Sequence, residues 1–130
     1  MTLSITGIYA AALAPIYLSL AARVILKRRA LNVGFGDGGS DDLQVRLRQH
    51  GNFTEIVPFA LILMALAEAG GLSAVWLHVC GVLLLVGRIL HPFGMNITCA
   101  AHPLRVAGAS FGFVAIVILG LALGRAALGL

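Results

Sequence analysis

The stretch Arg48-Gln49-His50-Gly51-Asn52-Phe53-Thr54-Glu55-Ile56-Val57-Pro58 decides the fold, because it places strongly polar side chains at the start of a long apolar run. Arg48, Asn52 and Glu55 are spaced i, i+4 and i+7, so on a helix they form one narrow stripe. A cation, an amide and a carboxylate at the depth where water gives way to lipid usually face a partner helix or a ligand. This stripe is the first candidate site.

The composition indicates an integral membrane protein. Of 130 residues, 60% are hydrophobic and 11% are charged, whereas soluble domains carry about 25% charged residues. Each apolar run approaches the roughly 20 residues that cross a ~30 Å hydrocarbon core, and backbone groups in lipid must be paired internally. The sequence therefore predicts an all-α, integral-membrane four-helix bundle that forms a single domain over residues 1–130. The runs cover about residues 3–26, 53–69, 72–90 and 104–128.

The basic residues predict the orientation. They cluster around the first and third connections, whereas the second connection, residues 68–71, has none. By the positive-inside rule, connections one and three are cytoplasmic and both termini are outside. The net charge of +4 then follows from topology, with binding of an anionic ligand as a second cause. Nucleic-acid binding is not expected, because the basic residues belong to helix ends and not to an aromatic-interleaved surface.

Two arginines at the ends of the third and fourth helices are further candidates. Arg88 is the expected partner of Glu55, since an unpaired charge at that depth is expensive. Arg105 follows Pro103 in the first turn of a helix, where the positive end of the helix dipole makes a cation unfavourable. An arginine at a helix N-terminus is explained if an anion lies between the Arg105 guanidinium and the N-terminus of this helix. A thiolate is one such anion, and nearby cations lower the pKa of a thiol.

Each candidate also has a simpler interpretation. The stripe residues and Arg105 are equally explained as anchors at the membrane interface. His91, three residues after Arg88, is explained as a hydrogen-bonded residue at a helix end. A metal site is not expected, because the histidines lack ligand spacing on one helix and no thiolate cluster accompanies them. Cys80 is predicted to be a small apolar core residue, and Glu68 is predicted to be a packed or interfacial polar residue and not part of a proton path.

Three motifs, in order and at the corresponding helix ends, resemble the MAPEG family, the membrane-associated proteins in eicosanoid and glutathione metabolism. The resemblance covers essentially the whole chain and is closest to the bacterial-type members. Its most specific element is Arg48-x-x-x-Asn52-x-x-Glu55 with Pro58. The other two are Val24-Ile25-Leu26-Lys27-Arg28-Arg29-Ala30, and Gly87-Arg88-x-x-His91 followed by Pro103-Leu104-Arg105.

The resemblance implies a homotrimer in the bacterial inner membrane, with glutathione as co-substrate held between adjacent subunits near the cytoplasmic face. Arg105 from the neighbouring subunit would stabilise the thiolate as the catalytic residue, and Arg28 and Arg29 would lie near the pocket mouth. The implied activity is a glutathione-dependent transferase or peroxidase that uses no metal. Its lipophilic electrophiles would enter from the bilayer between the first and fourth helices. The implied glutathione-binding residues are Arg48, Asn52, Glu55, Arg88 and His91.

The chain also departs from the family pattern. Family members often carry tyrosines on the third helix where this chain has His91 and Met95, and one extra residue lies between Arg88 and Arg105. A non-catalytic membrane ligand-binding or scaffold protein of the same fold is therefore an alternative. A small proton-coupled exporter is a third, although only His78 lies near the depth where such a mechanism needs an ionisable group.

Overall fold

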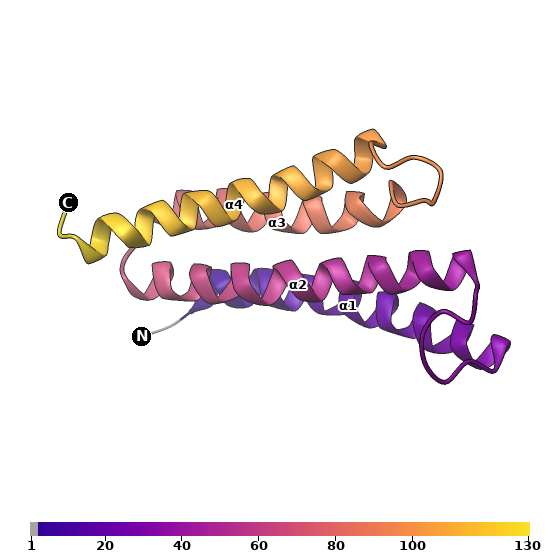
Figure 1. The fold of residues 1–130 in the computed structure, drawn as a ribbon. Coiled ribbons are helices and arrows are strands. Elements are labelled where there is room, and N and C mark those ends of the chain that lie inside the picture. Colours follow the sequence, from indigo (N-terminus) through magenta and orange to yellow (C-terminus); the bar gives the residue numbers. More distant parts are fainter. Residues whose placement is uncertain (1–2) are drawn as a thin grey trace.

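The chain forms four antiparallel helices and has no other regular element over residues 3–130, the part that the computed structural model describes. Figure 1 shows that the first and third connections lie at one end, opposite the two termini and the tight turn between the second and third helices. All four helices are long and apolar enough to cross a membrane. The predicted all-α membrane bundle is confirmed. The helices are α1 (Ser4–Leu31), α2 (Asp41–Ala69), α3 (Ala74–Phe93) and α4 (Pro103–Ala127).

Local signals set the helix ends that frame the first connection. Helix α1 runs past its apolar part to Leu31, and Asn32 ends it in the left-handed conformation, with a φ of 52°. The Asn32 N–H group donates to the carbonyl oxygen of Arg29, as in other helix C-caps of this type. At the start of α2, the Ser40 hydroxyl accepts from the Leu43 N–H at 3.3 Å, so Ser40 is the N-cap of this helix.

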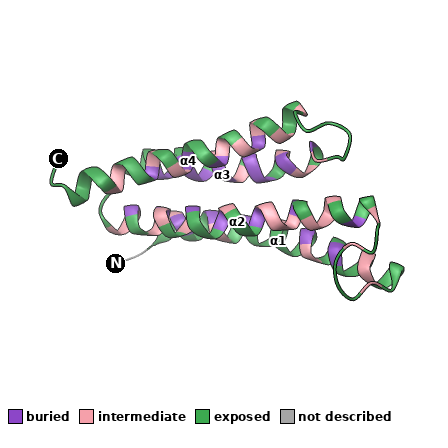
Figure 2. Cartoon of the chain, in the orientation of Figure 1, coloured by how far each residue is buried: buried purple, intermediate pink, exposed green. Residues whose placement is uncertain are grey.

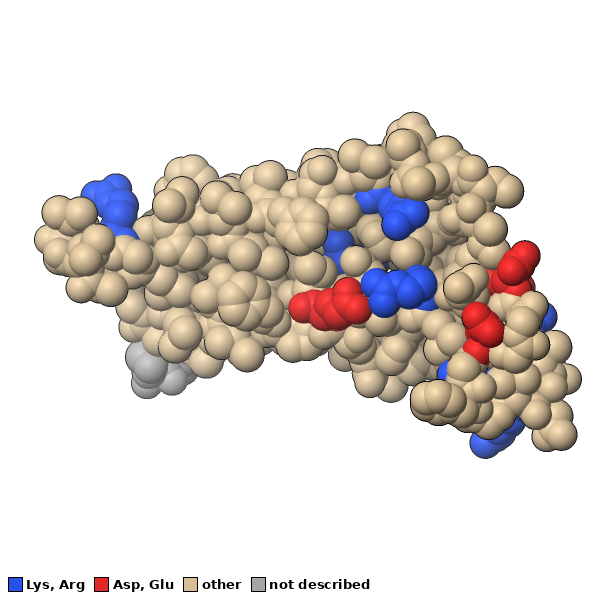
Figure 3. All heavy atoms as spheres, viewed as in Figure 1, with Lys and Arg blue, Asp and Glu red and all other residues tan. Residues whose placement is uncertain are grey.

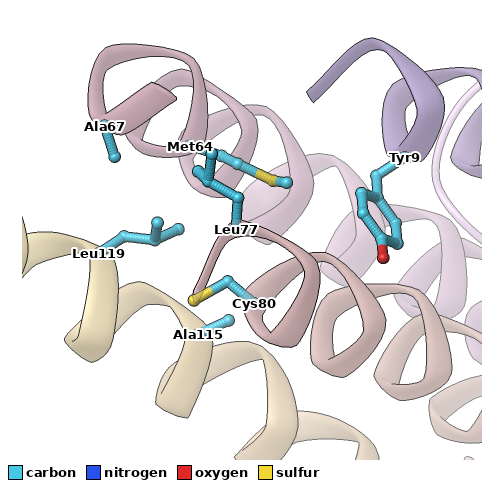
Figure 4. Close-up of a cluster of buried hydrophobic side chains, with 7 residues drawn as sticks. All are labelled: Tyr9, Met64, Ala67, Leu77, Cys80, Ala115 and Leu119. Atoms are coloured by element: carbon cyan, nitrogen blue, oxygen red, sulfur yellow. The ribbon is translucent and has the colours of Figure 1, made fainter. Parts of the chain in front are cut away.

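Two clusters of buried side chains join the helices. The cluster nearer the termini draws on all four helices, as Figure 4 shows, and it includes Cys80, whose predicted core position is confirmed. The outward faces remain exposed along most of each helix (Figure 2), as expected for a chain surrounded by lipid. The first cluster is Tyr9, Met64, Ala67, Leu77, Cys80, Ala115 and Leu119. The second is Leu13, Leu20, Phe53, Val57, Ala60 and Leu84.

Glycines allow α3 and α4 to approach closely near the loop end. A Cβ atom added to Gly87 would lie 2.7 Å from the carbonyl oxygen of Gly108, and one added to Gly108 would lie 2.7 Å from that of Gly87. Such close backbone approach is typical of membrane helices that pack through small residues. Helices α2 and α3 each contact all the other helices, whereas α1 and α4 do not contact one another within residues 3–130.

At the end of the bundle where the two chain termini lie, hydrogen bonds between polar groups join α1 to α2 and α3. The Glu68 carboxylate accepts hydrogen bonds from the backbone N–H groups of Ile5, at 2.9 Å, and Thr6, at 2.8 Å. It therefore caps the free donors at the start of α1. The Tyr9 hydroxyl lies 3.0 Å from His78 Nδ1. Glu68 is thus a packed polar residue, as predicted.

Candidate functional site

A hollow of about 190 Å³ opens between α2, α3 and α4 at the loop end of the bundle. Figure 3 shows basic side chains gathered around a hollowed part of this face, with an acidic side chain beside them. The structure brings four of the predicted site residues, from three helices, into this one hollow. The lining residues are Gln44, Val45, Arg48, Asn52, His91, Met95, Asn96, Ile97 and Arg105.

The stripe on α2 supplies one wall of the hollow. Arg48 and Asn52 line it, and Glu55 lies along the same stripe with its Oε1 3.3 Å from Arg48 Nη1. Both side chains of this ion pair are 56% exposed. Exposed pairs contribute less than about 1 kcal/mol, so a ligand with its own charges can displace this one at little cost.

Arg88 lies behind this wall and not in it. The predicted pairing of Arg88 with Glu55 is wrong, because Glu55 is held by Arg48 on the exposed side of α2. Arg88 is only 2% exposed. Its Nη1 donates to Asn52 Oδ1, and its Nη2 donates to the Gly108 carbonyl oxygen at 2.8 Å. These bonds fix the amide of Asn52 with its oxygen toward Arg88.

Backbone packing places Arg105 at the opposite wall. The His102 ring caps the first turn of α4 by accepting from the Leu104 N–H at 3.3 Å. A Cβ atom added to Gly94, just after α3, would lie 2.9 Å from both Cα and Cβ of Arg105 and closer still to its backbone nitrogen. The glycine therefore lets the end of α3 rest directly against Arg105.

The half-buried Arg105 side chain forms no salt bridge or hydrogen bond within the described part of the chain. The resemblance implied that a neighbouring subunit supplies this residue. Within one chain, Arg105 lines the same hollow as Arg48 and Asn52, and the contribution of a neighbouring subunit's Arg105 stays a prediction. One chain thus provides both sides of the candidate site.

The wall at the end of α3 is formed by His91, in the last turn of α3, and by Met95, which lies past the end of this helix and not on it as expected. His91 is 3% exposed, so only a small part of its ring reaches the hollow. The end of α3 is held against α2 by Gln49, whose Nε2 donates to the Pro92 carbonyl oxygen at 2.8 Å. No hydroxyl-bearing side chain is among the lining residues.

Sequence reasoning missed four lining residues. Gln44 precedes Arg48 by four positions, so extending the polar stripe by one turn would have found it. Val45 is apolar and carries no such signal. Asn96 and Ile97 lie in the connection between α3 and α4, where no helical periodicity exists to indicate which side chains face inward.

Arg28 and Arg29 lie elsewhere within a single chain. They line a separate shallow hollow at the end of α1, together with Asn32, Val33 and Gly34. Their expected place at the pocket mouth depends on a second subunit and stays a prediction.

The charges of the site favour an anion. Two guanidinium groups, of Arg48 and Arg105, face one hollow, and a third lies directly behind it at Arg88. Glu55 is the one carboxylate paired with these groups in the described residues. Among residues 3–130, no group of three histidine, cysteine or acidic residues lies close enough together to hold a metal ion.

Comparison with known proteins identifies the family. The sequence profile of the MAPEG family matches residues 6–125. The chain belongs to the MAPEG family. A relative of this MAPEG chain is the inner membrane protein YecN of Escherichia coli strain K12, 35% identical over 92 residues that cover 71% of this chain and 70% of YecN. YecN of Escherichia coli O6:H1 matches to the same extent. No solved structure matches the chain.

Proposed function

We propose that this MAPEG protein is a membrane-embedded, glutathione-dependent transferase or peroxidase that activates the glutathione thiolate against lipophilic electrophiles. The observation that carries the proposal is the position of Arg105, unpaired within the described chain and at a helix N-terminus, in the same hollow as Arg48 and Asn52. Glutathione carries two carboxylates, an ammonium group and a thiol. Arginine and asparagine side chains suit its carboxylates, and Glu55 suits its ammonium group.

Arg105 would act on the thiol. A free thiol with a pKa of about 8.5 is only about 3% ionised at pH 7. The guanidinium of Arg105 and the dipole of α4 both stabilise a thiolate between them. A pKa lower by about two units would make about three quarters of the bound thiol ionised at pH 7. The thiolate sulfur is then the nucleophile: it forms the new bond to the electrophile while the bond to the leaving group breaks, and the leaving group departs with that electron pair and takes up a proton.

The size of the hollow supports a homotrimer that completes the site. Ligand pockets of proteins usually enclose about 300–1,000 Å³, whereas one chain encloses about 190 Å³ here. A neighbouring subunit could close the hollow and bring Arg28 and Arg29 to its mouth. Helices α1 and α4 have outer faces free to pack in such an assembly or to admit an electrophile from lipid, because they do not contact one another within the described chain.

The proposed location is the bacterial inner membrane, with the hollow at the cytoplasmic face. The relative YecN is described as an inner membrane protein, which supports this location. The basic residues around the first and third connections support the orientation through the positive-inside rule.

A non-catalytic ligand-binding protein is the alternative function. The lining lacks the hydroxyl groups that tyrosines would offer to a bound peptide or thiol. Such a site could hold glutathione or a similar anion through Arg48 and Asn52 without ionising its thiol.

The test is rapid mixing of purified, detergent-solubilised protein with glutathione, followed by the ultraviolet absorbance of the thiolate. We expect a saturable burst at neutral pH, with about one proton released per thiolate formed. Arg105→Ala should abolish the burst and keep glutathione binding. Arg125→Ala, which removes an exposed arginine from the last turn of the same helix, is the matched control and should keep the burst.

The outcomes separate the two functions. Binding without a burst in the wild-type protein would establish the ligand-binding alternative. No binding at all, measured by calorimetry at glutathione levels well above cellular ones, would refute both.

A further inference from the structure

A second, shallow hollow lies where α1 ends and the first connection begins, at the loop end of the bundle (Figure 1). It encloses about 210 Å³ and shares no lining residue with the candidate glutathione site. We refer to it as the arginine hollow. No acidic side chain is among its lining residues, which are Arg28, Arg29, Asn32, Val33 and Gly34.

The two guanidinium groups of the arginine hollow have no partner within residues 3–130. Neither Arg28 nor Arg29 forms a salt bridge there, and Arg28 Nη1 is a buried donor without a hydrogen-bond partner. Buried polar groups in native proteins are nearly always paired. The carbonyl groups of the same two residues accept from the N–H groups of Val33 and Asn32, so they are not free to attract a cation. The hollow therefore presents positive charge that lacks an acceptor.

The acidic side chains close in sequence do not supply that acceptor. Asp42 pairs with Lys27 at 2.9 Å, and Asp37 Oδ1 accepts from the Gly39 N–H at 2.9 Å. Asp41 lies in the first turn of α2, where the helix dipole stabilises a carboxylate. None of these acidic residues lines the arginine hollow, so its charge favours an anion from outside the chain.

The arginine hollow lies at the depth of the lipid head groups. Helix α1 has 28 residues, which corresponds to about 42 Å, whereas the hydrocarbon core of a bilayer is about 30 Å thick. The apolar run of this helix ends near Leu26, so the two arginines come directly after the part that lies in hydrocarbon. The anions that a membrane offers at this depth are lipid phosphates.

An exposed aromatic side chain next to the hollow favours a lipid over a free phosphate ion. Phe35 follows Gly34 in the first connection and is 96% exposed. Removal of such a ring from water is favourable, and the apolar chains of a lipid bound at the hollow would provide the contact. A free phosphate ion would leave the ring in water.

We propose that the arginine hollow binds the phosphate group of an anionic phospholipid. Guanidinium groups donate paired, charge-assisted hydrogen bonds to phosphate oxygens. Because no acidic side chain lines the hollow, a head group that carries an ammonium group gains no partner for it. The proposal does not depend on glutathione chemistry. It differs from the expected place of Arg28 and Arg29 at the mouth of the glutathione site, and the experiment separates the two.

The experiment is native mass spectrometry of the full chain in detergent, with phosphatidylglycerol or phosphatidylethanolamine of the same acyl chains added. We expect phosphatidylglycerol to bind about 25-fold more tightly, which is about fivefold for each arginine. Inorganic phosphate or glutathione, each at tenfold excess over the lipid, should not displace it.

Variants test whether the hollow causes this preference. Arg28→Gln and Arg29→Gln should each weaken phosphatidylglycerol binding about fivefold and leave phosphatidylethanolamine binding unchanged. Arg23→Gln is the matched control, because it removes the same charge from an exposed position of α1 that does not line the hollow. It should weaken binding by less than about twofold. Phe35→Ser should weaken the binding of both lipids and keep the preference.

Four results would overturn the proposal. Equal binding of the two lipids would show that the hollow does not select a negative head group. An equal loss in Arg23→Gln would show that only the charge of this end of the bundle matters. Displacement by inorganic phosphate would make the occupant a free ion, and displacement by glutathione would assign the two arginines to the mouth of the glutathione site.

The lipid preference and both displacement experiments use the wild-type protein, so their results stand even if an arginine variant does not fold. The thiolate burst of Phe35→Ser should equal that of the wild type. Failure of the lipid proposal and failure of the glutathione proposal are therefore distinguishable.

Discussion

The position of Arg105 depends on Gly94, and the substitution Gly94→Ala tests whether that position matters. A Cβ atom at residue 94 would lie 2.9 Å from Cα and Cβ of Arg105, whereas ordinary contacts begin at 3.4 Å. The start of α4 must therefore move by at least 0.5 Å, the difference between these two distances. The backbone nitrogen of Arg105 must move further, because it lies closer to the added atom.

The expected effect is large for activation and small for binding. Misplacing a reacting group by about 1 Å can reduce a rate about a hundredfold, so a shift of this size should reduce thiolate formation by about ten- to a hundredfold. Arg48 and Asn52 lie on α2 and should keep their place, so glutathione affinity should fall by less than about threefold. Overpacking of the α3–α4 contact should also lower the free energy of unfolding by about 1–3 kcal/mol.

The assay is the thiolate burst after rapid mixing, with glutathione affinity measured separately by calorimetry. Gly120→Ala is the matched control, because it adds the same methyl group to α4 at a position with no atom within 4 Å. A normal burst in Gly94→Ala, together with loss of the burst in Arg105→Ala, would show that the charge of Arg105 matters but its placement by α3 does not. A normal burst in both variants would refute the role of Arg105.

Three further predictions concern stability and are measured by thermal unfolding in detergent. Glu68→Ala removes the acceptor of the Ile5 and Thr6 N–H groups at the start of α1 and should lower the midpoint of thermal unfolding, with faster hydrogen exchange confined to that first turn. Arg88→Met leaves Asn52 Oδ1 without its donor and removes the second donor to the Gly108 carbonyl, at a cost of about 1–3 kcal/mol for the unpaired amide oxygen. Gly108→Ala places a methyl group against the backbone of α3 and should cost about 1–3 kcal/mol or more, whereas Gly120→Ala should be nearly neutral.

The fold was predictable because lipid offers no hydrogen-bond partners to the backbone, which must therefore pair its own N–H and C=O groups. Runs of apolar residues of membrane length can only be helices, and the polar caps and glycines mark their ends. Helix α1 extends beyond its apolar run for a physical reason. Hydropathy ends at the basic residues 27–29, but the helix continues to Leu31 because backbone hydrogen bonding does not require apolar side chains.

The stripe on α2 was also predictable, because spacing along one helix needs no knowledge of its neighbours. The partner of each charge was not. Arg88 and Glu55 were paired by depth alone, but which face of α3 meets α2 depends on packing between helices. That packing sends Arg88 into the core toward Asn52 and leaves Glu55 to Arg48 on the outside.

The buried guanidinium of Arg88 explains how this end of the bundle can be polar and still packed. Its Nη atoms donate to Asn52 Oδ1 and to the backbone of α4. One rigid group therefore joins α2, α3 and α4 where α3 and α4 approach through glycines. Asn52 lines the candidate glutathione site, and its amide oxygen accepts from Arg88 behind it. A change of Arg88 should therefore alter the position of Asn52 and weaken glutathione binding, whereas a change of Arg105 should leave Asn52 in place.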